Sequence, residues 1–188
     1  MNQLTGNEEF TLRGVSAGIT IKDYWQWAYS DLLNNTHRGV VAEFLVYSSL
    51  YEITHDTEMR IDWLPFDLTS PSGRRIEVKS AAYLQSWTTD FPSQIRFNIA
   101  PKLAWDGKSY ATEAKRNNDL YVFCLFTALT RDIPILNLDY WEFYVLPTSI
   151  LNEKVPNQKT ISLSSLLNLK PVKTDYSELG RIIETIEL

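Results

Sequence analysis

The sequence predicts a mixed α/β fold, in which helices cover the faces of a central β-sheet. Apolar residues recur at helical spacing near both ends of the chain, and short runs rich in β-branched and aromatic residues lie between them. The most hydrophobic of these runs, Leu120 to Phe126, suits a central strand. With 188 residues, 44% of them hydrophobic, the chain can bury one substantial core, so we expect a single domain over residues 1–188.

Two helices are expected before the first strand. In the segment 23–33, apolar residues recur at helical spacing until the Asn34-Asn35 pair ends the pattern. A second helix should begin with Thr36 as its N-cap and continue to Leu50, with an apolar surface broad enough to pack on a sheet. Glu43 lies inside that surface. It must therefore sit at the exposed edge of the helix, which the helix alone favours, or face a cation.

The remaining elements follow from β-rich runs bounded by turn-forming residues. Six strands are expected, at residues 59–63, 65–69, 75–82, 94–99, 120–126 and 141–146. A short helix over 109–116 should separate the fourth strand from the fifth, and helices over 162–167 and 175–186 should finish the chain, the last capped by Thr174. We place the core at about 36–146, with an N-terminal helix at 23–33 and a C-terminal helical elaboration at 147–188.

Charge is distributed unevenly along the chain. The formal net charge of -5 argues at first against a nucleic-acid partner. Residues 70–116, however, carry eight basic and four acidic side chains. A solvated charged face explains this segment as well as a phosphate-binding surface does.

Cysteine usage and hydropathy exclude other classes. Cys124 lies inside an apolar run, where a buried and inert thiol is expected rather than a nucleophile. No apolar run approaches the ~20 residues of a membrane span, and the first ten residues are unlike a signal peptide. We therefore expect a cytoplasmic protein without a membrane partner.

Candidate site residues gather in the stretch from Phe66 to Ser80. Side chains alternate along a strand, so Glu77 and Lys79 should share one face while Ile76, Val78 and Ala82 face a core. A hairpin closed at Ser70 to Gly73 would bring Asp67 opposite Glu77. Two carboxylates and an ammonium would then converge, and hard divalent cations bind such oxygen pairs. The alternative is a simple salt bridge on a strand, but it would not need the third carboxylate, Glu43, on a separate helix.

These residues and their order resemble the PD-(D/E)XK nuclease superfamily, which includes restriction endonucleases, Holliday junction resolvases and repair nucleases. The resemblance covers about residues 36–146. The family's aspartate falls on Asp67, its acidic-x-Lys motif on Glu77-Val78-Lys79, and its helical glutamate on Glu43. The sequence departs from the literal motif in that Phe66 precedes Asp67 and the proline is Pro65. The resemblance implies a restriction endonuclease-like core with elements in the order αβββαβ.

The resemblance also implies a mechanism and a cofactor. Asp67, Glu77 and the Val78 carbonyl would hold Mg²⁺, with Mn²⁺ as a substitute, and the ion would activate water for hydrolysis of a phosphodiester bond. Glu43 would act as an outer ligand or position a metal-bound water, and Lys79 would orient the nucleophile or stabilise the transition state. If the strand after Lys79 stays extended, Gln85 continues the catalytic face. A surface glutamine explains Gln85 equally well.

Nucleic acid is the partner that this mechanism requires. Arg74, Arg75, Arg96 and Lys102 are the candidates for neutralising phosphates beside the site. Trp87 and Trp105 could stack on bases, although packing in an aromatic core accounts for them too. The expected function is a metal-dependent deoxyribonuclease acting alone, as a homodimer or with partner subunits. The alternatives are a catalytically silent nuclease-fold subunit of a DNA defence or repair complex, and an unrelated α/β protein with a charged sheet edge.

Overall fold

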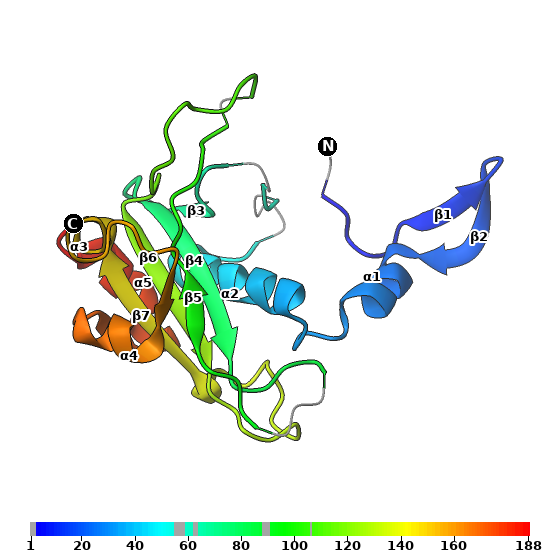
Figure 1. Ribbon diagram of the computed structural model, residues 1–188. Coiled ribbons are helices and arrows are strands. Elements are labelled where there is room, and N and C mark those ends of the chain that lie inside the picture. The colour runs from blue at the N-terminus through cyan, green and yellow to red at the C-terminus, as the bar shows by residue number, and fades with distance from the viewer. Residues whose placement is uncertain (1–2, 55–58, 62–63, 88–90, 106) are drawn as a thin grey trace.

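The computed structural model describes residues 3–54, 59–61, 64–87, 91–105 and 107–188, and shows a mixed α/β fold built on a five-stranded sheet (Figure 1). The sheet has the order β3-β4-β6-β7-β9. β4 and β6 are parallel, and the other neighbouring pairs are antiparallel. Its strands are β3 (Leu68–Thr69), β4 (Arg75–Ala82), β6 (Leu120–Phe126), β7 (Trp141–Pro147) and β9 (Val172–Thr174).

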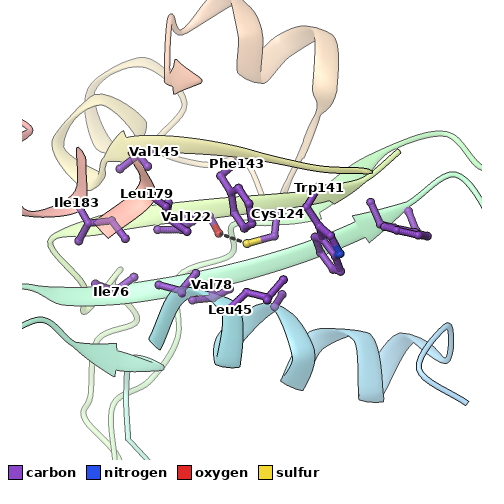
Figure 2. Packing of buried hydrophobic residues seen from close by; sticks show 14 of the residues in the cluster. Leu45, Ile76, Val78, Val122, Cys124, Trp141, Phe143, Val145, Leu179 and Ile183 are labelled. Carbon is purple, nitrogen blue, oxygen red and sulfur yellow. Dashed lines mark hydrogen bonds between the residues drawn. The ribbon is translucent and has the colours of Figure 1, made fainter. Parts of the chain in front are cut away.

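One face of the sheet is covered by helices α2 (Asn35–Leu50) and α5 (Tyr176–Thr185). Leu45 of α2 lies against Val78 of β4, while Leu179 and Ile183 of α5 lie beside Val145 of β7 (Figure 2). Cys124 is fully buried in this layer, where burial raises the pKa of its thiol, as expected for an inert cysteine. The two helices themselves are in close contact. A Cβ atom at Gly180 of α5 would lie 2.0 Å from the Ser49 carbonyl oxygen of α2.

The other face is covered by a two-stranded sheet and two short helices. Strands β5 (Arg96–Asn98) and β8 (Thr160–Ser162) pair with each other, and α3 (Thr148–Lys154) and α4 (Leu163–Asn168) lie beside them. The Phe97 ring contacts the Phe123 ring of β6 with 5.1 Å between centroids. Both faces of the sheet are thus buried, which explains why every residue of β6 is buried, as its run of apolar residues predicts.

The N-terminal arm, residues 3–30, extends away from the sheet (Figure 1), whereas Leu32 and Leu33 pack against the core. It consists of the hairpin β1 (Glu9–Leu12) and β2 (Val15–Thr20) followed by α1 (Ile21–Tyr29), and no residue of α1 is buried. α1 begins two residues before the expected position because Thr20 and Asp23 form a capping box. It also ends before Leu33.

Several expected elements differ from the structure. The prediction of a helix over 109–116 is wrong, since Lys115 bridges Lys102 and Tyr110 bridges Trp105 in extended pairs. The second helix of the expected αβββαβ order is therefore missing, and β5 leads to β6 without a helix among the described residues. The predicted strand over 94–99 is the three-residue β5, and it lies outside the central sheet because its apolar residues cover that sheet. Residues 59–61 form no strand, and residues 62–63 of that prediction lie outside the described residues.

The helix caps also correct the expected boundaries. Asn34 rather than Thr36 caps α2, since its side chain accepts from the Thr36 N–H at 2.9 Å. Asp175 rather than Thr174 caps α5 in the same way, through the Ser177 N–H at 2.9 Å. β1, β2, α3, β8 and β9 were not expected from the sequence. Among the described residues, no helix is both long and apolar enough to cross a bilayer.

Candidate functional site

Strand β4 positions the acidic-x-Lys segment between the two layers of the core. Ile76, Val78 and Ala82 face α2, as the alternation predicts. Glu77 projects from the opposite face and is 2% exposed, so its carboxylate is buried rather than solvated. The charged pair therefore does not lie on a solvent-facing sheet surface.

The predicted hairpin places Asp67 at the edge of β4. Its turn is closed by a hydrogen bond from the Gly73 N–H to the Ser70 carbonyl at 2.8 Å, with Gly73 at a φ of 86°. Pairing of Leu68 with Ile76 would extend back to Asp67 and Glu77, but β3 begins only at Leu68. Beyond that point the Asp67 carboxylate accepts a hydrogen bond from the Val78 N–H at 2.7 Å. Asp67 thus occupies the edge position that a longer β3 would fill.

The Val78 carbonyl points toward the same edge as Asp67. Backbone groups alternate sides along a strand, and the Ile76 carbonyl already accepts from the Asp67 N–H at 2.9 Å on this side. Val78 lies two residues further along β4, so its N–H and its carbonyl point toward this same edge. Asp67 and Glu77 therefore flank β4, one at its edge and one on its face, with the Val78 peptide between them.

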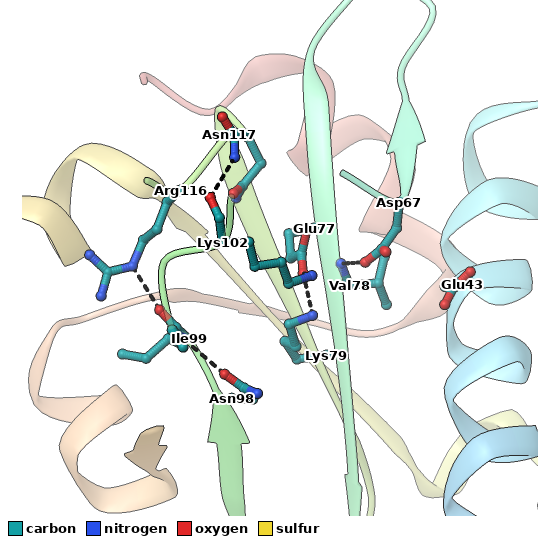
Figure 3. A network of polar contacts seen from close by, with 12 residues as sticks. Glu43, Asp67, Glu77, Val78, Lys79, Asn98, Ile99, Lys102, Arg116 and Asn117 are labelled. Carbon is teal, nitrogen blue, oxygen red and sulfur yellow. Dashed lines mark hydrogen bonds and ion pairs between the residues drawn. The ribbon is translucent and has the colours of Figure 1, made fainter. Parts of the chain in front are cut away.

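Two lysines neutralise Glu77. The same carboxylate oxygen of Glu77 accepts from the ammonium groups of Lys79 and Lys102 (Figure 3). Lys102 comes from the chain after β5, held by mutual backbone hydrogen bonds with Lys115. The Lys79 side chain is 18% exposed and that of Lys102 is 52% exposed, so the cluster opens to solvent on the Lys102 side. Lys102, expected only as a phosphate contact, is part of the cluster itself.

Glu43 of α2 completes the acidic group. Figure 3 shows it projecting from the helix toward Asp67. Arg60 holds its carboxylate through two hydrogen bonds, with Nε at 2.5 Å and Nη2 at 3.0 Å. The Glu43 side chain is 14% exposed, so it lies at a partly buried edge of α2 and faces a cation, which is provided by the protein. Sequence reasoning missed Arg60, because its partner is 17 residues away and no local pattern marks the pair.

Burial and like charge raise the pKa of Asp67 to about 6. Burial is the largest cause and the Glu77 charge the next, with Glu43 adding to it; Lys79 and the Val78 N–H act in the opposite direction. For Lys102, burial is the largest effect and lowers the pKa, but the hydrogen bond and charge of Glu77 together with the charge of Asp67 outweigh it, so the pKa lies above its usual value. The carboxylates are thus close enough to repel one another and would gain from an added cation.

The donor set fits a hard divalent cation. Within the described parts of the chain, no three acidic, histidine or cysteine side chains are grouped closely enough to hold a metal by themselves. Mg²⁺ does not require three, because it is commonly bound through one or two carboxylates and keeps several waters. Asp67, Glu77 and the Val78 carbonyl supply oxygen donors around one peptide of β4. Such an ion would offset the like charge that helps to raise the pKa of Asp67.

The predicted phosphate contacts do not form one surface. Arg74 donates to the carbonyls of Ile183 and Ile186 at 3.0 and 2.7 Å and so satisfies the C-terminal end of α5. Arg75 forms a two-point ion pair with Asp119. Arg96 is exposed on β5. Of the four residues, the structure brings Lys102 alone to the carboxylates.

Gln85 lies apart from this cluster. β4 ends at Ala82, so the extended strand that would place Gln85 on the catalytic face stops three residues short. The Gln85 amide instead donates to the Ala82 carbonyl and to Ser93 Oγ, both at 3.1 Å, and its buried Oε1 has no hydrogen-bond partner within the described structure. Its contacts tie the loop after β4 together. Trp87 and Trp105 are 54% and 38% exposed.

No protein-family model matches the chain, and no curated protein matches it significantly. The indication of function is therefore the geometry of four residues, Glu43, Asp67, Glu77 and Lys79.

Proposed function

We propose that this protein is a metal-dependent nuclease that hydrolyses phosphodiester bonds in DNA, with a restriction endonuclease-like core. One observation carries the proposal. Asp67 is bonded to the peptide N–H of Val78, and that residue stands between Glu77 and Lys79. A structural salt bridge would need one carboxylate and one ammonium, whereas here Asp67 and Glu77 flank one buried strand and Glu43 faces Asp67 from α2.

Each side chain would have a distinct task. Asp67, Glu77 and the Val78 carbonyl would hold Mg²⁺, for which Mn²⁺ is a possible substitute. When bound, the ion would supply a Lewis acid that activates water and offsets charge on the phosphate. Lys79 would stabilise negative charge that develops in the transition state, and burial strengthens its effect because the local dielectric is low. Glu43 would position a metal-bound water on the side of Asp67. Lys102 would bind the phosphate from the solvent-exposed side of the cluster.

Cleavage assays test the proposal directly. Plasmid, linear and branched DNA would be incubated with Mg²⁺, Mn²⁺ or EDTA and with the wild type, Asp67→Ala or Lys79→Ala. We expect cutting that requires the metal and falls about 100-fold or more in both variants. Lys173→Ala is the matched control, since Lys173 is also ion-paired to a glutamate but lies on β9. Cutting that persists in EDTA, or in both site variants, would contradict the proposal.

The N-terminal arm favours a second candidate, a catalytically silent binding or assembly subunit. Leu12, Val15 and Trp27 are 72%, 69% and 85% exposed on it, and exposed apolar surface of this kind marks contact sites for other proteins. The ion pairs that already satisfy Glu43 and Glu77 suit the same role. If the wild type cuts none of the DNA substrates while it and the variants remain folded, this second function takes precedence.

A further inference from the structure

A cavity of about 550 Å³ lies beside the candidate catalytic carboxylates, between α2 and the residues that lead into β3. Glu43 and Asp67 line it, together with Phe44, Tyr47 and Leu64. Its volume is within the range of pockets that bind small molecules, roughly 300–1,000 Å³. The carboxylates thus form one part of the wall of a space large enough for an organic group.

The helix side of this cavity is an apolar and aromatic row. Val40, Phe44, Tyr47 and Tyr51 follow one another at intervals of four, three and four, which places them on one face of α2. This face differs from the one that packs on the sheet. Phe44, the residue after Glu43, is 52% exposed. The Tyr47 and Tyr51 rings stack with their centroids 4.8 Å apart.

The charged side chains that line the cavity are Glu43, Glu52, Asp67 and Arg60, so its charge is net acidic. The Tyr51 hydroxyl donates to the Thr69 carbonyl at 2.7 Å, which anchors that ring against β3. Arg60, which also lines the cavity, is fixed by its two bonds to Glu43. An aromatic wall that leads to carboxylates able to hold a divalent cation suits a ligand with a flat aromatic part and a phosphate that binds through the cation.

The geometry points to a nucleobase pocket in this cavity, so that the substrate class is DNA with an unpaired nucleotide at the cleavage point. The inference rests on the proposed function for the position of the phosphate. With a phosphate at Asp67 and Glu77, the attached base reaches Phe44 only if it leaves the helical stack, because a paired base is enclosed by its neighbours. Stacking on aromatic side chains accepts any base, so the pocket selects unpaired DNA rather than a sequence.

Binding measured without cleavage tests the pocket. The probes are a single-stranded oligonucleotide containing 2-aminopurine and a fully paired duplex of the same sequence, each titrated with the protein in Ca²⁺, a hard cation that takes oxygen ligands. We expect the unpaired probe to bind at least about tenfold more tightly. Phe44→Ala and Phe44→Leu should each weaken that binding about tenfold, the second because it keeps apolar bulk but removes the ring. Phe91→Ala, at a phenylalanine 81% exposed on another loop, should leave it unchanged.

The outcomes separate the pocket from the nuclease proposal when Mg²⁺-dependent cutting is measured in parallel. Equal binding of paired and unpaired probes, or unchanged binding in both Phe44 variants, overturns the pocket. If cutting then still depends on Asp67, the nuclease proposal survives without it. Binding that requires Phe44 in a protein that cuts no DNA supports the pocket and overturns the catalytic proposal.

Discussion

The carboxylate of Asp67 accepts a hydrogen bond from the backbone N–H of Val78 at 2.7 Å, just outside the strand pairing that begins at Leu68. This bond joins Asp67 to Val78 at the edge of β4. The two neighbours of Val78, Glu77 and Lys79, form an ion pair on the buried face of the strand. A single peptide therefore connects the two halves of the candidate site.

Replacing Asp67 by asparagine should stabilise the protein in a pH-dependent way. Burial raises the pKa of Asp67 in the folded state to about 6 from 3.8, so its ionised form is penalised by folding. The penalty is small near pH 4, grows between about pH 4 and 6, where the folded state binds the extra proton, and is complete above about pH 7. In EDTA, Asp67→Asn should raise the free energy of unfolding by about 2 kcal/mol at pH 8 and by little at pH 4, because the amide cannot ionise. Urea denaturation at both pH values measures this, and an equal effect at both would contradict it.

Lys102→Met should make Mg²⁺ bind more tightly. Lys102 and Lys79 share one oxygen of Glu77, so Lys102 competes with an added cation for that carboxylate. Its removal should lower the dissociation constant of Mg²⁺ by roughly three- to tenfold, since a nearby like charge is lost. Isothermal titration calorimetry without DNA measures the constant. Lys173→Met is the control, because that lysine has a similar exposure and pairs with the distant Glu142; the same change in both variants would refute the competition.

Replacing Arg74 should lower the stability of the protein, whereas replacing Arg96 should affect only its binding to DNA. Arg74→Ala removes two charge-assisted hydrogen bonds at the end of α5 and should cost about 2 kcal/mol in the free energy of unfolding. Arg96→Ala removes an exposed charge and should leave stability within about 0.5 kcal/mol. If Arg96 meets a phosphate, its loss should reduce the salt dependence of DNA binding by about one unit of slope. Denaturation curves and binding at several salt concentrations measure the two effects; a reversed pattern would assign the arginines the opposite roles.

Two helical glycines should respond in opposite directions to alanine. A Cβ at Gly180 would lie 2.0 Å from the Ser49 carbonyl oxygen, so Gly180→Ala must push α5 away from α2 and should cost about 2–3 kcal/mol. Gly39→Ala meets no atom within 4 Å inside α2 and should gain about 0.5–1 kcal/mol from helix propensity. Thermal denaturation of both variants checks the pair. Equal changes in stability for the two variants would show that helix propensity, rather than the contact between α5 and α2, determines the effect of Gly180→Ala.

The sequence by itself determined the elements that depend on local spacing. The apolar run at Leu120–Phe126 became the buried central strand β6, and the alternation in Arg75–Ala82 became β4. The Ser70 to Gly73 turn also formed as predicted, since a positive φ at glycine is a local preference. These features follow from period and burial, which neighbouring residues specify.

Only the tertiary structure decided which distant residues meet. Lys102 reaches Glu77 from 25 residues away, and Arg60 reaches Glu43 from 17. Likewise β5 pairs with β8 across the chain, and residues 109–116 form bridges instead of the expected helix. Periodicity does not encode these contacts, because a long charged side chain or a short strand can satisfy several partners. Packing of the whole chain selects among them by the desolvation and hydrogen bonding that each choice requires.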